Sequence, residues 1–147
     1  DISAGDSGKV IMKNCRSDLA YSPVFNLTRG AVPKDAFYEV TILNPPEGAA
    51  PTARTSLGTI CGDRCTFILH DGTTRPLPEE YNVLRCGGGF RKNQGLTNST
   101  VTNYTAAKVI LDEYVRNCTI NSVGPVEDRG KGNTITQIEP ERTAARQ

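Results

Sequence analysis

Side chains near the middle of this chain could together transfer protons and hold a phosphate. His70 is the only histidine, Glu79 and Glu80 follow it, and Arg85 comes shortly after. An imidazole acid, a carboxylate base and a guanidinium are the groups that would cleave RNA through a cyclic phosphate. The sequence therefore contains the parts of a ribonuclease-like site made of His70, Glu79 or Glu80, and Arg85. The alternative is a solvent-exposed histidine on a sheet with no catalytic role.

Two short segments would have to position these groups. Cys65–His70 and Tyr81–Cys86 each alternate in polarity as strands do. If they pair antiparallel with their two cysteines opposite each other, His70 and Arg85 lie on the same polar face, because strand side chains alternate strictly between faces. The larger apolar side chains then lie on the other face, where a helix could cover them.

The predicted arrangement resembles small fungal guanyl ribonucleases, in which a helix packs on one face of an antiparallel sheet and the other face carries the chemistry. That family places its helix before the catalytic strands and has a second histidine after the arginine. In this chain the predicted helix follows the strands, and there is no second histidine. The resemblance implies a hydrolase or an inactive relative.

The predicted helix covers about 99–118. At about 100° per residue, one stripe of this stretch collects mainly apolar side chains, and polar ones face away from it. Asn98 or Ser99 could cap its first turn, and Arg116 suits the C-terminal end of the helix dipole. The stripe consists of Tyr104, Ala107, Leu111, Tyr114, Val115 and Cys118.

The remaining apolar patterns predict strands, at Lys9–Lys13, Ala20–Asn26, Phe37–Leu43 and Asn133–Ile138. In Phe37–Leu43, alternate residues face opposite ways, as in a half-buried antiparallel strand. We expect an α+β fold: an antiparallel β-sheet or sandwich of about six or seven short strands with one main helix. It forms a single domain over 1–138, followed by a polar C-terminal tail, 139–147.

Residues 8–26, GKVIMKNCRSDLAYSPVFN, resemble the opening of thaumatin-like proteins and of the yeast-phase-specific secreted proteins of fungi. In those proteins a β-hairpin carries an Asn–Cys pair. This chain lacks the many cysteines of thaumatin-like proteins and their acidic-cleft motifs. The resemblance implies a secreted protein with a β-sandwich-like fold, and it assigns no catalytic or binding residue.

The five cysteines lack the paired CxxC spacing of a zinc site, so disulfides are expected and no metal is. The antiparallel register favours Cys65–Cys86, and Cys15–Cys118 would then tie the first strand to the end of the helix. The alternative is a local Cys61–Cys65 bridge. A catalytic Cys61 acting with His70 is a third interpretation.

Four Asn-X-Ser/Thr sequons occur, which together with the cysteines favour a secreted, extracellular protein. Asn26, Asn98 and Asn117 are predicted glycosylation sites. Asn103 borders the buried stripe of the predicted helix, so we expect it to be modified poorly.

Charge and composition limit the partners. Seventeen basic and sixteen acidic side chains give a net charge of +1, which creates no field for nucleic acid or anionic lipid, so neither nucleic-acid binding nor membrane insertion is expected. The segment Arg85–Lys92 could form an anion-binding backbone nest, but three glycines after a strand are more often a turn. No cofactor is predicted.

From these features we expect a small secreted, non-enzymatic protein of the effector or elicitor type, fungal in origin and acting in virulence. It would bind a protein or surface partner of a host, and the sequence leaves its oligomeric state open. The alternatives are a ribonuclease-like secreted hydrolase and a plain ligand-carrying secreted domain.

Overall fold

The computed structural model describes residues 25–26, 34–42, 58–72, 83–87 and 95–141, and every regular element in these ranges is a β-strand. The strands form three sheets in which all pairs are parallel. The first sheet contains β1 (Phe25–Asn26), β3 (Gly58–Ile60), β6 (Val83–Cys86), β9 (Lys108–Leu111) and β12 (Val126–Asp128). The second contains β2 (Phe37–Ile42), β5 (Thr66–Asp71), β8 (Thr100–Asn103), β11 (Thr119–Ser122) and β13 (Thr134–Gln137). The short third contains β4 (Gly62–Asp63), β7 (Leu96–Thr97) and β10 (Val115–Arg116).

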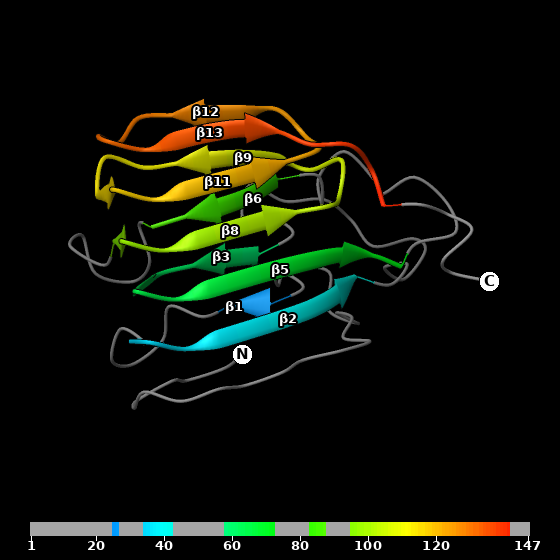
Figure 1. Cartoon of the computed structure of the whole chain (residues 1–147), viewed down its shortest axis with the longest axis horizontal. Coiled ribbons are helices and arrows are strands. Elements are labelled where there is room, and N and C mark those ends of the chain that lie inside the picture. Colours follow the sequence, from blue (N-terminus) through cyan, green and yellow to red (C-terminus); the bar gives the residue numbers. More distant parts are fainter. Residues whose placement is uncertain (1–24, 27–33, 43–57, 73–82, 88–94, 142–147) are drawn as a thin grey trace, which may run out of the picture.

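The chain visits these sheets in rotation, so the molecule is a parallel β-helix. One coil runs through β3, β4 and β5, the next through β6, β7 and β8, and the next through β9, β10 and β11. Figure 1 shows the two five-stranded sheets as two layers, with successive coils stacked along one axis. Each coil hydrogen-bonds to the coils before and after it, which is how a solenoid builds a continuous core from short repeats.

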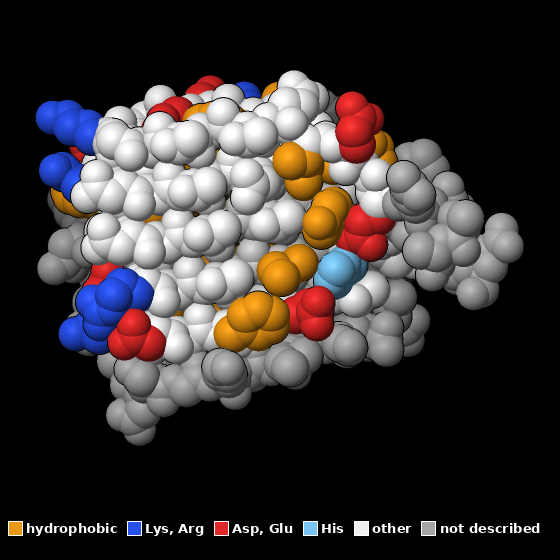
Figure 2. Space-filling model, in the orientation of Figure 1, with side chains coloured by type: hydrophobic (Ala, Val, Ile, Leu, Met, Phe, Trp, Pro, Cys, Tyr) orange, Lys and Arg blue, Asp and Glu red, His pale blue; other side chains and the backbone are white. Residues whose placement is uncertain are grey.

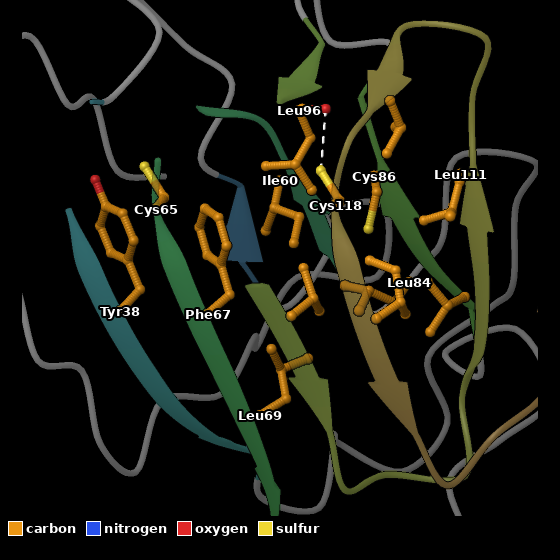
Figure 3. Close-up of a cluster of buried hydrophobic side chains, with 14 of the residues drawn as sticks. Tyr38, Ile60, Cys65, Phe67, Leu69, Leu84, Cys86, Leu96, Leu111 and Cys118 are labelled. Atoms are coloured by element: carbon orange, nitrogen blue, oxygen red, sulfur yellow. Dashed lines mark hydrogen bonds between the residues drawn. The ribbon is translucent and has the colours of Figure 1, made fainter. Parts of the chain in front are cut away.

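The core consists of rows of inward side chains in register between coils. One row of the second sheet runs from Tyr38 through Phe67, Val101 and Ile120 to Ile135. The rings of Tyr38 and Phe67 stack with centroids 5.2 Å apart and planes 8° from parallel. Figure 3 shows Tyr38 and Phe67 in one buried cluster with Ile60 and Leu84 of the first sheet. Because every inward row repeats with the coil, the same few positions of each coil are apolar.

A second row, of left-handed residues, forms one corner of the coil. Its members have φ between 52° and 72° and precede the second sheet in every coil: Asp35, Arg64, Asn98, Asn117 and Gly132. Asp, Asn and Gly adopt this conformation at lower cost than other residues, so a short polar or glycine residue occupies this corner in every coil except the one with Arg64. The following residue turns inward, and Cys65, Ser99 and Cys118 are all buried there.

The predicted helix over 99–118 is wrong, because this stretch contains β8, β9 and β10. Its buried side chains recur every second residue, which is the period of a strand. This spacing holds for Ser99, Val101, Asn103, Thr105, Ala107, Val109 and Leu111, and Val115 and Cys118 are buried beyond it. Asn103 and Thr105 are polar but point inward. The apolar residues alone therefore do not alternate along this stretch, and their spacing fits a helical stripe better. Many β-branched residues in the stretch also favour strands.

The antiparallel pairing of the two central segments is also wrong. Strands do form there, as β5 and β6, but β5 pairs with β2 and β8, while β6 pairs with β3 and β9. The two strands lie in different sheets, so their alternating patterns reflect burial against a shared core and not contact with each other. The fold is consequently neither an α+β fold nor an antiparallel sandwich. The predicted strand Phe37–Leu43 is confirmed as β2, and Asn133–Ile138 as β13, but both pair in parallel.

The expected disulfides are corrected as well, because the four described cysteines, Cys61, Cys65, Cys86 and Cys118, carry thiols. Cys65 and Cys86 are not opposed. Cys65 directly precedes β5 of the second sheet, whereas Cys86 is the last residue of β6 in the first sheet. Cys15, the proposed partner of Cys118, lies outside the described residues. Stacked apolar rows, and not cross-links between the described cysteines, hold the described coils together.

Candidate functional site

His70 lies on the outer surface of the second sheet. In β5 the side chains of Phe67 and Leu69 point into the core, so His70 points outward by alternation. It stacks on the ring of Tyr104, which follows β8 in the next coil, with centroids 5.7 Å apart and planes 11° from parallel. The backbone N–H of Tyr104 donates to the carbonyl of Leu69, which continues the β5–β8 register to this pair.

Two carboxylates flank the imidazole of His70. Its Nε2 lies 2.8 Å from Glu39 Oε2, and its Nδ1 lies 2.5 Å from Glu141 Oε1. Glu39 comes from β2 in the preceding coil, whereas Glu141 comes from the segment that follows β13. The three side chains are 23–27% exposed, so the cluster is partly shielded from water. His70 therefore ties three distant parts of the chain together.

The charge of His70 follows from these contacts. Partial burial alone would lower the pKa of His70, but the hydrogen bonds to Glu39 and Glu141 outweigh it, and the net pKa is raised. A neutral imidazole has one N–H, whereas the protonated ring has two. Only the protonated ring can donate to both carboxylates at once. With both ring nitrogens engaged, His70 has no free nitrogen with which to take a proton from a substrate.

The other members of the predicted acid–base site are not gathered around His70. Arg85 lies in β6 of the first sheet, between buried Leu84 and Cys86, and its exposed side chain points to the opposite side of the molecule. Glu79 and Glu80 lie outside the described residues. The two carboxylates that do contact His70 are Glu39 and Glu141, which sequence reasoning missed because they are distant in the chain.

Cys61 and His70 do not form a catalytic pair either. Cys61 is fully buried between β3 and β4, whereas His70 points outward. Burial raises the pKa of the Cys61 thiol to about 12, so almost no nucleophilic thiolate is present at neutral pH. The predicted anion nest Arg85–Lys92 lies mostly outside the described residues.

Regular rows of mostly uncharged polar side chains cover the outer surface of the same sheet, which we call the ladder face. Its first row begins at Phe37 of β2 and continues with Thr66, Thr100, Thr119 and Thr134, in register across the coils. Its second consists of Glu39, Ile68, Thr102, Asn121 and Thr136. Figure 2 shows this broad face, with a line of hydrophobic side chains separating the white polar area from acidic groups and the histidine.

A signal for this face was present in the sequence. Thr-x-Thr or Thr-x-Asn occurs at Thr100–Thr102, Thr119–Asn121 and Thr134–Thr136, each with one apolar residue in the middle. The apolar residue points into the core and the polar residues point out. An uneven repeat of this kind indicates a solenoid, but variable connections between the coils concealed it.

The predicted glycosylation sites occupy different environments. Asn98 and Asn117 lie exposed at the left-handed corner, and Asn98 Nδ2 lies 3.1 Å from Asp63 Oδ1. Asn26 lies in β1. Asn103 is fully buried, and its Nδ2 donates to the Ala107 carbonyl and to Ser122 Oγ. The expected poor modification of Asn103 stays a prediction, now argued from burial in a strand and no longer from a helix.

The described residues contain no cluster of three or more His, Cys, Asp or Glu side chains arranged to hold a metal ion. They also contain no helix that could cross a membrane. No protein-family model and no curated protein matches this chain. The resemblance of residues 8–26 to thaumatin-like proteins stays a prediction, as does the expected extracellular location.

Proposed function

We propose that this protein is a non-enzymatic binding module that holds an extracellular partner on its ladder face. The observation that carries the proposal is the outer surface of the second sheet, where hydroxyl and amide side chains repeat in register over successive coils. Adjacent strands of a sheet lie about 4.8 Å apart, so the rows offer polar groups at a regular interval. Such a surface suits an extended partner that makes many weak contacts.

The chemistry of the rows restricts the partner. No lysine or arginine lies in either row, and the only charged member is Glu39, which is engaged by His70. A phosphate polymer or a nucleic acid would find no cation on the rows. An uncharged polar partner surface complements the hydroxyls and amides without burying an unpaired charge.

The alternative of a secreted hydrolase has one observation in its favour, the contact of His70 with two carboxylates. Against it, both ring nitrogens are occupied, and Arg85 is on the other sheet. We therefore assign the His70 cluster a structural role in closing the C-terminal segment onto the ladder face. The effector or elicitor role is part of the same proposal, with a host surface as the partner.

The test combines a binding screen with two matched variants. Immobilised extracellular proteins and neutral surface polysaccharides are probed with the purified protein at low and high salt. We expect a hit that persists at high salt, because an uncharged contact is not screened. Thr119→Lys, on the ladder face, should weaken binding at least tenfold, while Arg85→Ala, on the opposite sheet, should leave it unchanged.

Loss of binding with Arg85→Ala but not with Thr119→Lys would place the partner elsewhere and overturn the proposal. RNA cleavage is measured in parallel and should stay at background. A bell-shaped cleavage profile that His70→Ala abolishes would instead favour the hydrolase.

A further inference from the structure

The last coil ends in an uncovered core. Ile135 belongs to the inward row that contains Tyr38, Phe67, Val101 and Ile120, all of which are almost fully buried. Ile135 is nevertheless 42% exposed, and it is the one large hydrophobic side chain that is exposed in the described part of the chain. Figure 1 shows β12 and β13 as the outermost strands at this end of the stack.

Among the described strands, β13 also pairs on one side only, with β11. The N–H of Thr134 donates to the carbonyl of Cys118, which directly precedes β11. The N–H of Ile138 donates to the carbonyl of Ser122 in β11. Because the groups of alternate residues point to opposite sides of a strand, the N–H and C=O of Ile135 and Gln137 point to the free edge. Natural edge strands are usually protected by charged side chains, proline or a bulge. β13 has the sequence Thr-Ile-Thr-Gln, with none of the protective residues.

The described residues that follow β13 lead away from this end. After Ile138 the chain turns back, and Glu141 lies against His70 in β5, several coils below β13. Figure 1 shows the segment after β13 descending along the stack. The open edge and the exposed isoleucine therefore need an occupant that comes from outside the described chain.

We propose that the occupant is a second copy of this chain, joined tail to tail about a two-fold axis. A two-fold axis perpendicular to the sheets places β13 antiparallel to β13 of the copy, so the second sheet continues through the junction. The edge of β12 carries Glu127 and Asp128, which oppose pairing of that strand with its counterpart. Such an interface is self-complementary. The register that keeps inward residues inward places Ile135 opposite Ile135 of the copy, and Thr134 opposite Thr136.

The chemistry of the edge agrees with this register. Ile135 would exchange both backbone hydrogen bonds with its counterpart, and the two isoleucine side chains would cover each other. β13 contains no charged residue, so pairing it with β13 of the copy brings no like charges together within this strand pair. The end of one solenoid offers less area than the roughly 1,200–2,000 Å² that standard interfaces bury, so we expect association in the micromolar range.

The experiment uses the full chain and measures mass by light scattering and sedimentation over a concentration series. The native protein should shift from monomer to dimer as concentration rises. Ile135→Lys and Ile135→Glu should each weaken dimerisation at least tenfold, because two like charges would face each other. A one-to-one mixture of the two variants should dimerise again. Ile68→Lys, a matched change on the ladder face, should leave dimerisation unchanged.

A second measurement checks the register independently of charge. Cα atoms of a hydrogen-bonded antiparallel pair lie about 5.5 Å apart, within the range of a disulfide. Ile135→Cys should therefore give a covalent dimer on mild oxidation. Circular dichroism confirms that the variants are folded.

A native protein that stays monomeric at all concentrations would overturn the proposal. So would open-ended assembly, or a mixture of the Lys and Glu variants that fails to dimerise. Ligand binding through the ladder face is independent of these outcomes.

Discussion

The buried thiols of Cys86 and Cys118 differ in their surroundings. Cys118 Sγ lies 3.3 Å from the Leu96 carbonyl and 3.4 Å from the Arg116 carbonyl, both of which can accept from it; Figure 3 marks the first contact. Cys86 is surrounded by core residues and makes no such hydrogen bond within the described chain. Burial raises the pKa of both thiols, so both stay protonated at neutral pH.

Serine substitution should separate the two positions. Cys118→Ser retains a donor beside two carbonyls, so we expect a change of less than about 1 kcal/mol in the free energy of unfolding. Cys86→Ser buries a hydroxyl without a partner and should cost about 1–3 kcal/mol. Urea unfolding of both variants measures the difference. Equal losses would mean that the carbonyl contacts of Cys118 do not matter.

Asn103 connects β8 to the turn that leads into β9. Its Oδ1 accepts from the backbone N–H of Thr105 at 3.1 Å and from Thr105 Oγ1 at 2.6 Å, while its Nδ2 donates to Ala107 and Ser122. Ser122 Oγ in turn donates to the Gly124 carbonyl. Both the oxygen and the nitrogen of the buried Asn103 amide therefore have hydrogen-bond partners, which offsets the cost of burying them.

Removing that side chain should therefore be costly. Asn103→Ala leaves buried partners unsatisfied and should lower the free energy of unfolding by about 2–3 kcal/mol. Asn121→Ala, outward on the ladder face, should change it by less than about 0.5 kcal/mol. Chemical denaturation compares the two. A small loss at Asn103 would show that water replaces the amide.

The same burial predicts the glycosylation pattern. A glycan on Asn103 would replace a hydrogen of the Nδ2 group that donates two buried hydrogen bonds, whereas Asn98 and Asn117 are exposed at the corner. Expression in a eukaryotic secretory host, followed by site-resolved mass spectrometry, should show occupancy at Asn98 or Asn117 and none at Asn103. Substantial occupancy of Asn103 in folded protein would contradict its burial.

At the scale of elements, the His70 cluster joins the segment after β13 to β5 and β2. Because the folded pKa of His70 is raised, its contribution to stability is complete below the unfolded pKa of about 6.5. The contribution is lost as pH rises above that value and through the folded pKa. The contact between Glu141 and His70 should therefore loosen toward alkaline pH.

Thermal melting at a series of pH values tests this linkage. Between about pH 6 and 8 the native protein should lose about 0.5–1 kcal/mol more than His70→Ala does, a modest figure because the cluster is partly exposed. Glu141→Gln should show a smaller pH dependence than the native protein and a larger one than His70→Ala, since Glu39 is retained. An identical pH dependence in the native protein and His70→Ala would contradict the role of the cluster.

At the scale of the whole molecule, stability should vary along the stack. Each coil contacts its neighbours, so inner strands such as β8 and β11 are held on both sides, while β13 is held on one. Opening should begin at the end with the free edge and the exposed Ile135.

Hydrogen exchange measures this gradient directly. In dilute protein, amides of β13 should exchange at least tenfold faster than those of β8. At concentrations where the tail-to-tail dimer forms, protection of β13 should rise, and Ile135→Lys should abolish that rise. Uniform protection along the dilute chain would show that it opens as one cooperative unit.

The alternation of apolar residues by itself determined several strands, including the inward Tyr38 and Val40 of β2 and the inward Leu84 and Cys86 of β6. It also separated outward His70 and Arg85 from the core, because side-chain direction in a strand depends only on local geometry. Between 99 and 118 the local pattern failed, since buried Asn103 and Thr105 interrupt it and their burial depends on partners that only the fold supplies.

Only the tertiary structure decided which strands are neighbours. Outward His70 and Arg85 could have shared one antiparallel sheet or lain on two parallel sheets, and their sequence pattern is the same in both cases. Coiling of the chain put them on different sheets, brought Glu39 and Glu141 to His70, and aligned threonines from separate coils into a row. Contacts between coils form across long and unequal stretches of sequence, so no local spacing records them.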